Sequence, residues 1–367
     1  MTNNLLINGN FDLWQKGTTF SIPWDHPDSF TSYTAPNLKI ADRWYVHDTL
    51  GRGVGSTGSV YFYRETFSQN SQFSSFANYY LTIQNQLTDI ESGFLYIENK
   101  QEDCKKYSNI PLSFSFYAKT LNGVTGITMS CYYRQAIHPD NKEVGVVFSE
   151  NIELQPQWNF YSFNFTPFAS NFSGISGDHY FSVGFRANPN SNFSIANVLL
   201  QENKNDNNSF ILLTDPEEEK KRQEKYYKTS YPIGFTAGSV TITNENDTSA
   251  VFITTTPNYS SNYTFDVPMR KIPTITTYSP KSGTQNDAYN KTATKDMRLT
   301  SGTRGWNQAT RFSPTGAETI SSIGNTYGIQ FNISSGAVVF DDLLVHFVAD
   351  ADIDTGSSDR GLETLDF

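Results

Sequence analysis

The sequence predicts an all-β protein, and three observations carry this prediction. Aromatic residues make up 15% of the chain and charged residues only 17%, and aromatic side chains favour the pleated, half-buried surface of a sheet. Many segments alternate apolar and polar residues with a period of two, which is typical of strands with one buried face. Clusters of Asn, Gly, Ser and Pro separate these segments, as in turns. The expected architecture is an N-terminal jelly-roll sandwich, a short linking helix and a smaller C-terminal β-sandwich.

The strand pattern places the jelly-roll domain at residues 1–212. Within LSFSFYAKTL (Leu112–Leu121), Phe114 and Phe116 alternate with serines. WNFYSFNFTPF (Trp158–Phe168) sets Tyr161, Phe163 and Phe165 on one face in the same way. Period-two strands joined by polar turns indicate an antiparallel sandwich.

One segment breaks the β pattern and predicts a linking helix at residues 213–231. Asp215 is a suitable N-cap and Pro216 suits the first helical position. Acidic residues fill the first turn and lysines dominate the end, which complements the helix dipole. Shorter strand-like segments then predict a C-terminal β-sandwich at residues 232–354, followed by a tail at residues 355–367.

Composition excludes several classes of function. The net charge of −10 argues against nucleic acid as a partner, because an acidic chain repels phosphate backbones. No window approaches 18 consecutive apolar residues, so we expect no membrane contact, and the N-terminus lacks the pattern of a secretory signal. Cys104 and Cys131 make neither a disulfide framework nor a zinc motif.

The sequence contains no recognisable catalytic motif. Its five histidines form no metal-binding pair, and no nucleophile elbow, phosphate-binding glycine loop or dinucleotide fingerprint occurs. The Asp341-Asp342 pair and the aspartates at 350, 352 and 354 lack the spacing of a calcium-binding EF-hand loop. Adjacent carboxylates do not face each other across a sugar, as a glycosidase requires. We therefore expect a protein that is not an enzyme and requires no cofactor.

Aromatic residues on strands and in polar loops are the remaining candidates for a binding site. Aromatic rings stack on the apolar faces of sugars, while neighbouring polar groups bind the hydroxyls. We predict a carbohydrate-binding role for Trp24, Tyr133 and Trp306. The alternative for each is a structural role in the core or on a strand. That structural role is the expectation for three further tryptophans, Trp14, Trp44 and Trp158.

An ordered series of motifs resembles one known family. NLLINGNFDLWQKGTTF, followed by IADRW (Ile40–Trp44), resembles the opening of tailed-bacteriophage virion structural proteins of the tail-fibre or head-decoration type. LSFSFYAKT, WNFYSFNFTPF, FSIANVLLQE, EKKRQEKYYKTS and TFDVPMRKIPTIT resemble later segments of that family in the same order. The first domain also resembles carbohydrate-binding modules of the galactose-binding jelly-roll type.

The resemblance implies a location in the virion and a non-enzymatic appendage or fibre component that engages host-surface glycans. It implies other virion proteins as partners and a homo-oligomer, expected as a trimer, with host polysaccharide as a further partner. Two alternatives stay open. One is a capsid decoration or head-fibre protein on the shell, and the other is a glycan-degrading enzyme.

The resemblance to carbohydrate-binding modules also implies a metal site. Those modules often hold a structural calcium where the opening and closing strands meet. By position, the corresponding residues here are Asp12 and Asn197, although Asp and Asn replace the residue types usual in that family.

Overall fold

The chain divides into two compact units, unit 1 containing Met1–Asp215 and unit 2 formed by Pro216–Asp352. No helix in the described part of the chain is long and apolar enough to cross a membrane. The computed structural model describes residues 4–23, 38–48, 51–52, 58–69, 71, 73, 77–86, 90–92, 94–102, 104–121, 127–137, 142–167, 179–187, 191–202, 215–242, 250–254, 260–271, 273–291, 294–298, 301–302, 311–312, 328–333 and 342–351.

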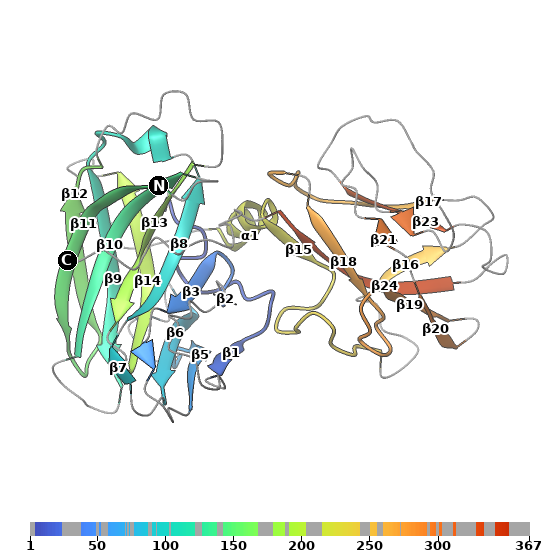
Figure 1. Cartoon of the computed structure of the whole chain (residues 1–367), viewed down its shortest axis with the longest axis horizontal. Helices are drawn as coiled ribbons and strands as arrows, with labels where there is room; N and C mark the ends of the chain where they lie inside the picture. Colours follow the sequence, from blue (N-terminus) through green and yellow to red (C-terminus); the bar gives the residue numbers. More distant parts are fainter. Residues whose placement is uncertain are drawn as a thin grey trace. The chain divides into compact units, whose positions relative to one another are not determined.

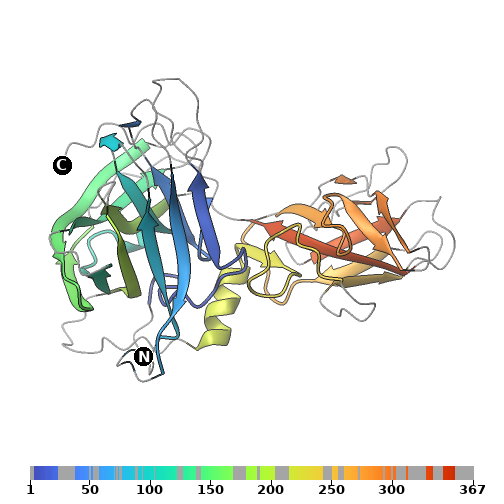
Figure 2. The same cartoon turned by 90° about the horizontal axis from the view of Figure 1, so that it is seen from below.

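Unit 1 is a sandwich of two six-stranded antiparallel sheets. The sheets lie one behind the other in Figure 1 and are seen from below in Figure 2. Sheet A has the order β1 (Thr19–Pro23), β5 (Ser59–Thr66), β6 (Tyr79–Asn85), β14 (Phe193–Glu202), β9 (Leu112–Thr120), β12 (Asn159–Phe165). Sheet B has the order β11 (Lys142–Leu154), β10 (Ile127–Ile137), β13 (His179–Ala187), β8 (Leu95–Glu102), β3 (Trp44–Asp48), β2 (Leu38–Lys39). The short strands β4 (Gly51–Arg52) and β7 (Ile90–Ser92) pair with each other, and η1 is Cys104–Tyr107.

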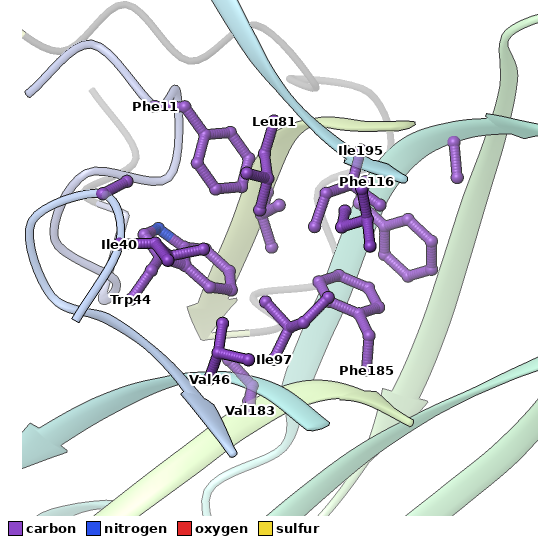
Figure 3. Close-up of a cluster of buried hydrophobic side chains, with 14 of the residues drawn as sticks. Phe11, Ile40, Trp44, Val46, Leu81, Ile97, Phe116, Val183, Phe185 and Ile195 are labelled. Carbon is purple, nitrogen blue, oxygen red and sulfur yellow. The ribbon is translucent and has the colours of Figure 1, made fainter. Parts of the chain in front are cut away.

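The core of unit 1 lies between the two sheets and is rich in phenylalanine. Phe114 and Phe116 on β9 meet Phe185 on β13, with ring centroids 5.8 and 4.8 Å apart. Figure 3 shows Phe116, Phe185 and Trp44 pointing toward the same interior region. Trp14 and Trp44 are both fully buried, which confirms their expected structural role. The alternation of apolar and polar residues on β9 thus separates an inner face from an outer one.

The two opening motifs, far apart in the sequence, fold against each other. Trp44 donates its indole Nε1–H to the backbone oxygen of Asn8 at 2.9 Å, and the Asn8 side chain donates to the backbone oxygen of Asp42 at 3.0 Å. The ring of Phe11 lies 4.8 Å from that of Trp44. Asn8 and Phe11 have positive φ angles of 59° and 58°, a conformation that Asn adopts more easily than most residues. The motifs are therefore a structural device of the sandwich.

The segment before this turn runs along β14 without forming a regular strand. Leu5 N donates to Leu200 O at 2.8 Å and Val198 N donates to Gly9 O at 2.9 Å. The side chain of Asn4 bonds the backbone of the same strand at both Val198 and Leu200. A Cβ atom on Gly9 would lie 2.1 Å from Val198 O. Only glycine allows this close approach of two backbones.

Unit 2 is a smaller β structure around the long strand β24 (Asp342–Asp350). Tyr263 and Phe347 lie 4.7 Å apart in its core. The sheet with β24 contains β15 (Tyr227–Thr229), β16 (Val251–Thr254), β18 (Thr274–Tyr278), β19 (Asp287–Asn290) and β20 (Lys295–Arg298). A second sheet has the order β17 (Ser260–Thr264), β23 (Gly328–Ile333), β22 (Arg311–Phe312), β21 (Ser301–Gly302), with β22 and β23 parallel.

The predicted fold class, mostly β with a short helix, is confirmed. The helix itself is shorter than the predicted span of residues 213–231. Helix α1 covers Pro216–Glu224, and the next residues form β15, which pairs antiparallel with β24. Tyr226 and Tyr227 are buried there, so packing into a sheet overrides the local preference for continued helix. The predicted tail at residues 355–367 lies outside the described residues.

Candidate functional site

Of the three residues predicted for carbohydrate binding, only Tyr133 lies within the described residues. Trp24 and Trp306 lie outside the described residues. Tyr133 lies on β10 opposite Val183, a fully buried core residue of β13. The neighbouring Tyr132 lies opposite Gly184 instead, at the register position of the outer face of sheet B.

A cluster of aromatic residues covers part of the outer face of sheet A. Phe67 and Phe73, from the connection between β5 and β6, pack with Ala77 over the small Ala196 of β14. Around this base stand three partly buried rings, those of Tyr80, Tyr117 and Trp158. Phe160 joins them through its contact with Tyr117 at 5.2 Å. We call this set the outer aromatic cluster; its members are Phe67, Phe73, Tyr80, Tyr117, Trp158 and Phe160.

Trp158 is the centre of the outer aromatic cluster. Its ring centroid lies 5.3 Å from Tyr80, 5.5 Å from Phe67 and 5.6 Å from Phe73. Tilted and edge-to-face rings at such distances attract each other beyond their simple burial. The expected structural role of Trp158 therefore holds only in part. The residue lies on the solvent side of a sheet, where its ring is half-buried and not enclosed.

The register of sheet A explains why the cluster forms. Tyr117 on β9 lies opposite both Ala196 on β14 and Phe160 on β12. Directly opposite residues of neighbouring strands point to the same face. Phe160 has 37% of its surface exposed, while Tyr161, next to it, stacks on the core residue Phe116 at 5.6 Å. The solvent face of β12 therefore carries an apolar ring where its pattern would allow a polar residue.

A lysine lies over the outer aromatic cluster. Lys119 Nζ is 4.9 Å from the ring centroid of Trp158 and 5.6 Å from that of Tyr80. A cation at such distances is attracted by the electrons of the ring face. Within the part of the chain that the structure describes, no hydrogen bond or ion pair involves this ammonium group. Its three N–H donors are therefore available to a ligand held on the rings.

The electrostatics of this site follow from partial burial. Burial lowers the pKa of Lys119, and the negative charge of the exposed Glu65 opposes that shift. Burial, and then the charge of Glu65, raises the pKa of Tyr80, and burial alone raises the pKa of Tyr117. Both phenols stay protonated at neutral pH and are hydrogen-bond donors. The site thus combines flat apolar rings with an ammonium, two phenols and a carboxylate.

The outer face of sheet B carries a second group of charges in a different setting. Lys100 Nζ lies 3.1 Å from Glu98 Oε1, and both side chains are fully buried. The same ammonium group is 5.1 Å from the ring of Tyr45 and 5.3 Å from that of Tyr180. Arg43 donates to the backbone oxygen of Lys100 and, at 3.2 Å, to the hydroxyl of Tyr45. Glu98 balances the charge of Lys100, and Arg43 bonds to neighbouring oxygens, so we assign this group a structural role.

The residues predicted as calcium ligands lie close to one backbone contact. Asn197 adjoins Val198, which bonds Gly9, and Asp12 follows three residues after that glycine. Asn197 has a φ angle of 48° at a bulge of β14, and its buried side-chain oxygen has no hydrogen-bond partner in the described structure. The side-chain oxygen of Asn10 is buried in the same way.

Carboxylate and amide oxygens are the donors that calcium takes. The residue types at these positions therefore fit the ion, and Asp12, Asn197 and Asn10 would hold it. Bound there, the ion would tie the opening segment to β14. No group of three or more His, Cys, Asp or Glu side chains suited to a metal occurs in the described stretches, so such a site depends on amide and backbone oxygens.

No protein-family model and no curated protein matches the sequence. Among solved structures, the chain is similar to the enzymatically active domain of tailspike protein 4 from bacteriophage CBA120, at 15% identity and a TM-score of 0.31, over 44% of this chain and 19% of that one. It is similar to the CBM22-1 xylan-binding domain from Paenibacillus barcinonensis, at 10% identity and a TM-score of 0.29, over 55% and 95% of the two chains.

A cyclase from Fischerella sp. TAU is similar at 13% identity and a TM-score of 0.33, over 53% of this chain and 93% of that one. The chain therefore matches less than a fifth of the tailspike chain and almost the full length of the xylan-binding domain and the cyclase.

The outer aromatic cluster includes residues that the sequence pattern did not single out. Tyr117 and Lys119 occupy the polar positions of β9, where an alternating pattern predicts solvent-facing residues. An aromatic residue at such a position is a usable signal, and Phe160 on β12 shows it too. Phe67 and Phe73 come from a connection between strands, and no periodic signal marks them.

Proposed function

We propose that this chain is a non-enzymatic structural protein of a phage virion, an appendage or fibre component that binds host-surface glycan. The observation that carries the binding part is the outer aromatic cluster with Lys119 above it. The virion part is supported by the ordered series of sequence motifs, from the Asn-Gly-Asn opening to the Val-Pro-Met-Arg segment.

The cluster suits a sugar because it offers both kinds of contact that a sugar ring needs. Trp158 and Tyr80 present partly exposed aromatic surface, against which the C–H groups of a pyranose pack. Lys119 donates to ring or hydroxyl oxygens, and Glu65 accepts from hydroxyl groups. Rings already held by neighbouring rings lose little conformational entropy on binding, which favours affinity.

A glycan array and isothermal titration with the hits test the binding part. Trp158→Ala should weaken binding by about 2 kcal/mol, roughly 30-fold, because a central aromatic anchor carries a large share of such energy. Trp158→Phe is the matched control and should keep most of the affinity, since it retains a ring. An array without hits, or a Trp158→Ala variant that binds as well as the wild type, would contradict the proposal.

The virion part has its own test. Quantitative mass spectrometry of purified particles should find this chain at the low copy number of an appendage. A copy number in the hundreds would favour the alternative of a capsid decoration protein. Release of reducing ends from host polysaccharide by the purified chain would instead favour a glycan-degrading enzyme.

A further inference from the structure

Unit 2 presents a short apolar segment to solvent, residues 231–242. Four large hydrophobic residues are exposed in the described part of the chain, and three of them lie in this segment. Ile233 is 60% exposed, Phe235 43% and Val240 47%. Single exposed apolar residues are common, whereas several of them within one short exposed segment favour an interaction site.

Contacts with Tyr231 and His346 hold the segment in place. The ring of Tyr231 stacks on the imidazole of His346, with centroids 4.0 Å apart, and its hydroxyl accepts a hydrogen bond from Gly238 N at 3.0 Å. The imidazole of His346 also contacts the segment directly, since its Nε2 lies 2.6 Å from Thr241 Oγ1. Burial raises the pKa of Tyr231 to about 12, so this anchor stays neutral at physiological pH.

A neighbouring turn fixes the same segment from a second direction. The backbone N–H groups of Thr241 and Ile242 both donate to Pro280 O, at 2.9 and 3.1 Å. A Cβ atom on Gly283 would lie 2.0 Å from Gly238 O, and both glycines have positive φ angles, of 73° and 84°. Only glycine permits this contact. The exposed apolar residues are thus preorganised, which reduces the entropy lost on association.

Charge indicates what covers this surface. No residue from Tyr231 to Ile242 carries a charge, in a chain whose net charge is −10. Two copies of an acidic chain repel each other, so they associate most easily through an uncharged surface, and interface cores are depleted in charged residues. A basic or acidic partner would find no complementary charge within the segment. A two-fold or higher symmetric contact needs only a patch that complements itself.

We propose that residues 231–242 form a contact surface between copies of this chain. Ile233, Phe235 and Val240 are the side chains that bury against the neighbouring copy. The anchoring contacts of Tyr231 and His346 position them. This surface lies in unit 2 and is independent of the glycan-binding proposal for unit 1.

Sedimentation velocity of the full chain tests the proposal. The chain is measured at about 1–50 µM, which covers micromolar dissociation constants. The wild type should self-associate, and Ile233→Ser with Phe235→Ser should raise the dissociation constant at least tenfold. Phe160→Ser is the matched control, because it removes a phenylalanine of similar exposure, 37% against 43% for Phe235, from unit 1 and should leave association unchanged.

Thermal unfolding and near-ultraviolet circular dichroism of each variant check that the fold is intact. A wild type that remains monomeric across the range would overturn the proposal. So would a folded double variant that associates as the wild type does, or loss of association in Phe160→Ser alone.

Discussion

The two outer faces of the N-terminal sandwich place a lysine in nearly the same aromatic surroundings. Lys100 on sheet B lies 5.1 and 5.3 Å from two tyrosine rings, and Lys119 on sheet A lies 4.9 and 5.6 Å from a tryptophan and a tyrosine. The difference is the counter-charge. Lys100 has Glu98 at 3.1 Å and is fully buried, whereas Glu65 influences Lys119 only at longer range.

This difference separates a structural charge from one that is available to a ligand. A buried ammonium group is tolerated because a carboxylate balances it, and loss of either partner leaves an unpaired charge in a low dielectric. A half-exposed ammonium group on aromatic rings keeps part of its hydration and can exchange water for a ligand oxygen. Mutations on the two faces should therefore affect different properties of the protein.

The largest effect is expected from Glu98→Gln on sheet B. The substitution removes the negative charge 3.1 Å from the buried ammonium group of Lys100, which should lower the free energy of unfolding by about 3–5 kcal/mol. Urea unfolding measures this loss. Glu65→Gln is the matched control on sheet A and should change stability by less than about 0.5 kcal/mol, because Glu65 is exposed. Equal effects of the two substitutions would remove the distinction between the faces.

Calcium should stabilise unit 1 without acting on either face. If Asp12 and Asn197 hold the ion, calcium at about 100 times its dissociation constant adds about 2.7 kcal/mol to the free energy of unfolding. Thermal unfolding in calcium and in a chelator measures the difference, and Asp12→Asn should abolish it. Identical unfolding curves in both conditions would show that these oxygens hold no calcium.

Lys119→Gln should weaken glycan binding about tenfold, which corresponds to about 1.4 kcal/mol. The physical reason is the loss of a charged donor above Trp158 while the rings remain in place. Titration calorimetry measures the affinity, and Lys119→Arg should retain most of it. Stability should change little, since no ion pair is broken. Unchanged affinity in Lys119→Gln would assign the lysine to packing alone.

The smallest effect is a pH dependence of the same contact. Burial lowers the pKa of Lys119. In the folded protein its ammonium group therefore loses a proton at a pH below about 10.4, the ordinary pKa of lysine. Glycan affinity should therefore fall as pH rises toward 10, and Lys119→Arg should remove the decline. A wild type and an arginine variant with the same pH profile would contradict this.

The pH dependence that Lys119 gives to stability is opposite to the one that it gives to glycan binding. Between its lowered pKa and about 10.4 the unfolded chain holds more protons than the folded one, so this contribution increases with pH. For Lys228 in unit 2, burial lowers the pKa, but the hydrogen bonds and charges of Glu224, Tyr263 and Asp266 together outweigh burial and raise the pKa overall. Its contribution is present below about pH 10.4 and is lost as pH rises through the raised pKa.

Much of the fold could be predicted because alternation encodes it directly. On β9 the residues at every second position, Leu112, Phe114 and Phe116, belong to the core between the two sheets. The serines between them belong to the other face of the strand, although Ser113 and Ser115 are buried too. The helix start at Pro216 was predictable from capping chemistry. Its end was not, because Tyr227 joins β24, which lies more than a hundred residues away.

The binding residues were harder to predict for the same reason. Alternation says that Tyr117 and Phe160 face away from the core, but it does not say that they face each other. Their proximity follows from the pairing of β9 with β12. Phe67, Phe73 and Trp158 lie outside the regular strands, where no period constrains them.

By itself, the sequence determined the β class, the inner faces of the strands and the glycine at position 9 that lets two backbones meet. These are local properties, because side-chain period and backbone freedom depend on neighbouring residues alone. Only the tertiary structure decided that the Lys100–Glu98 pair is buried beside the rings of Tyr45 and Tyr180. It also decided that Lys119 lies partly exposed over the rings of Trp158 and Tyr80. Strand register and loop packing bring together residues that are distant in sequence, and a charge acquires its role from those neighbours.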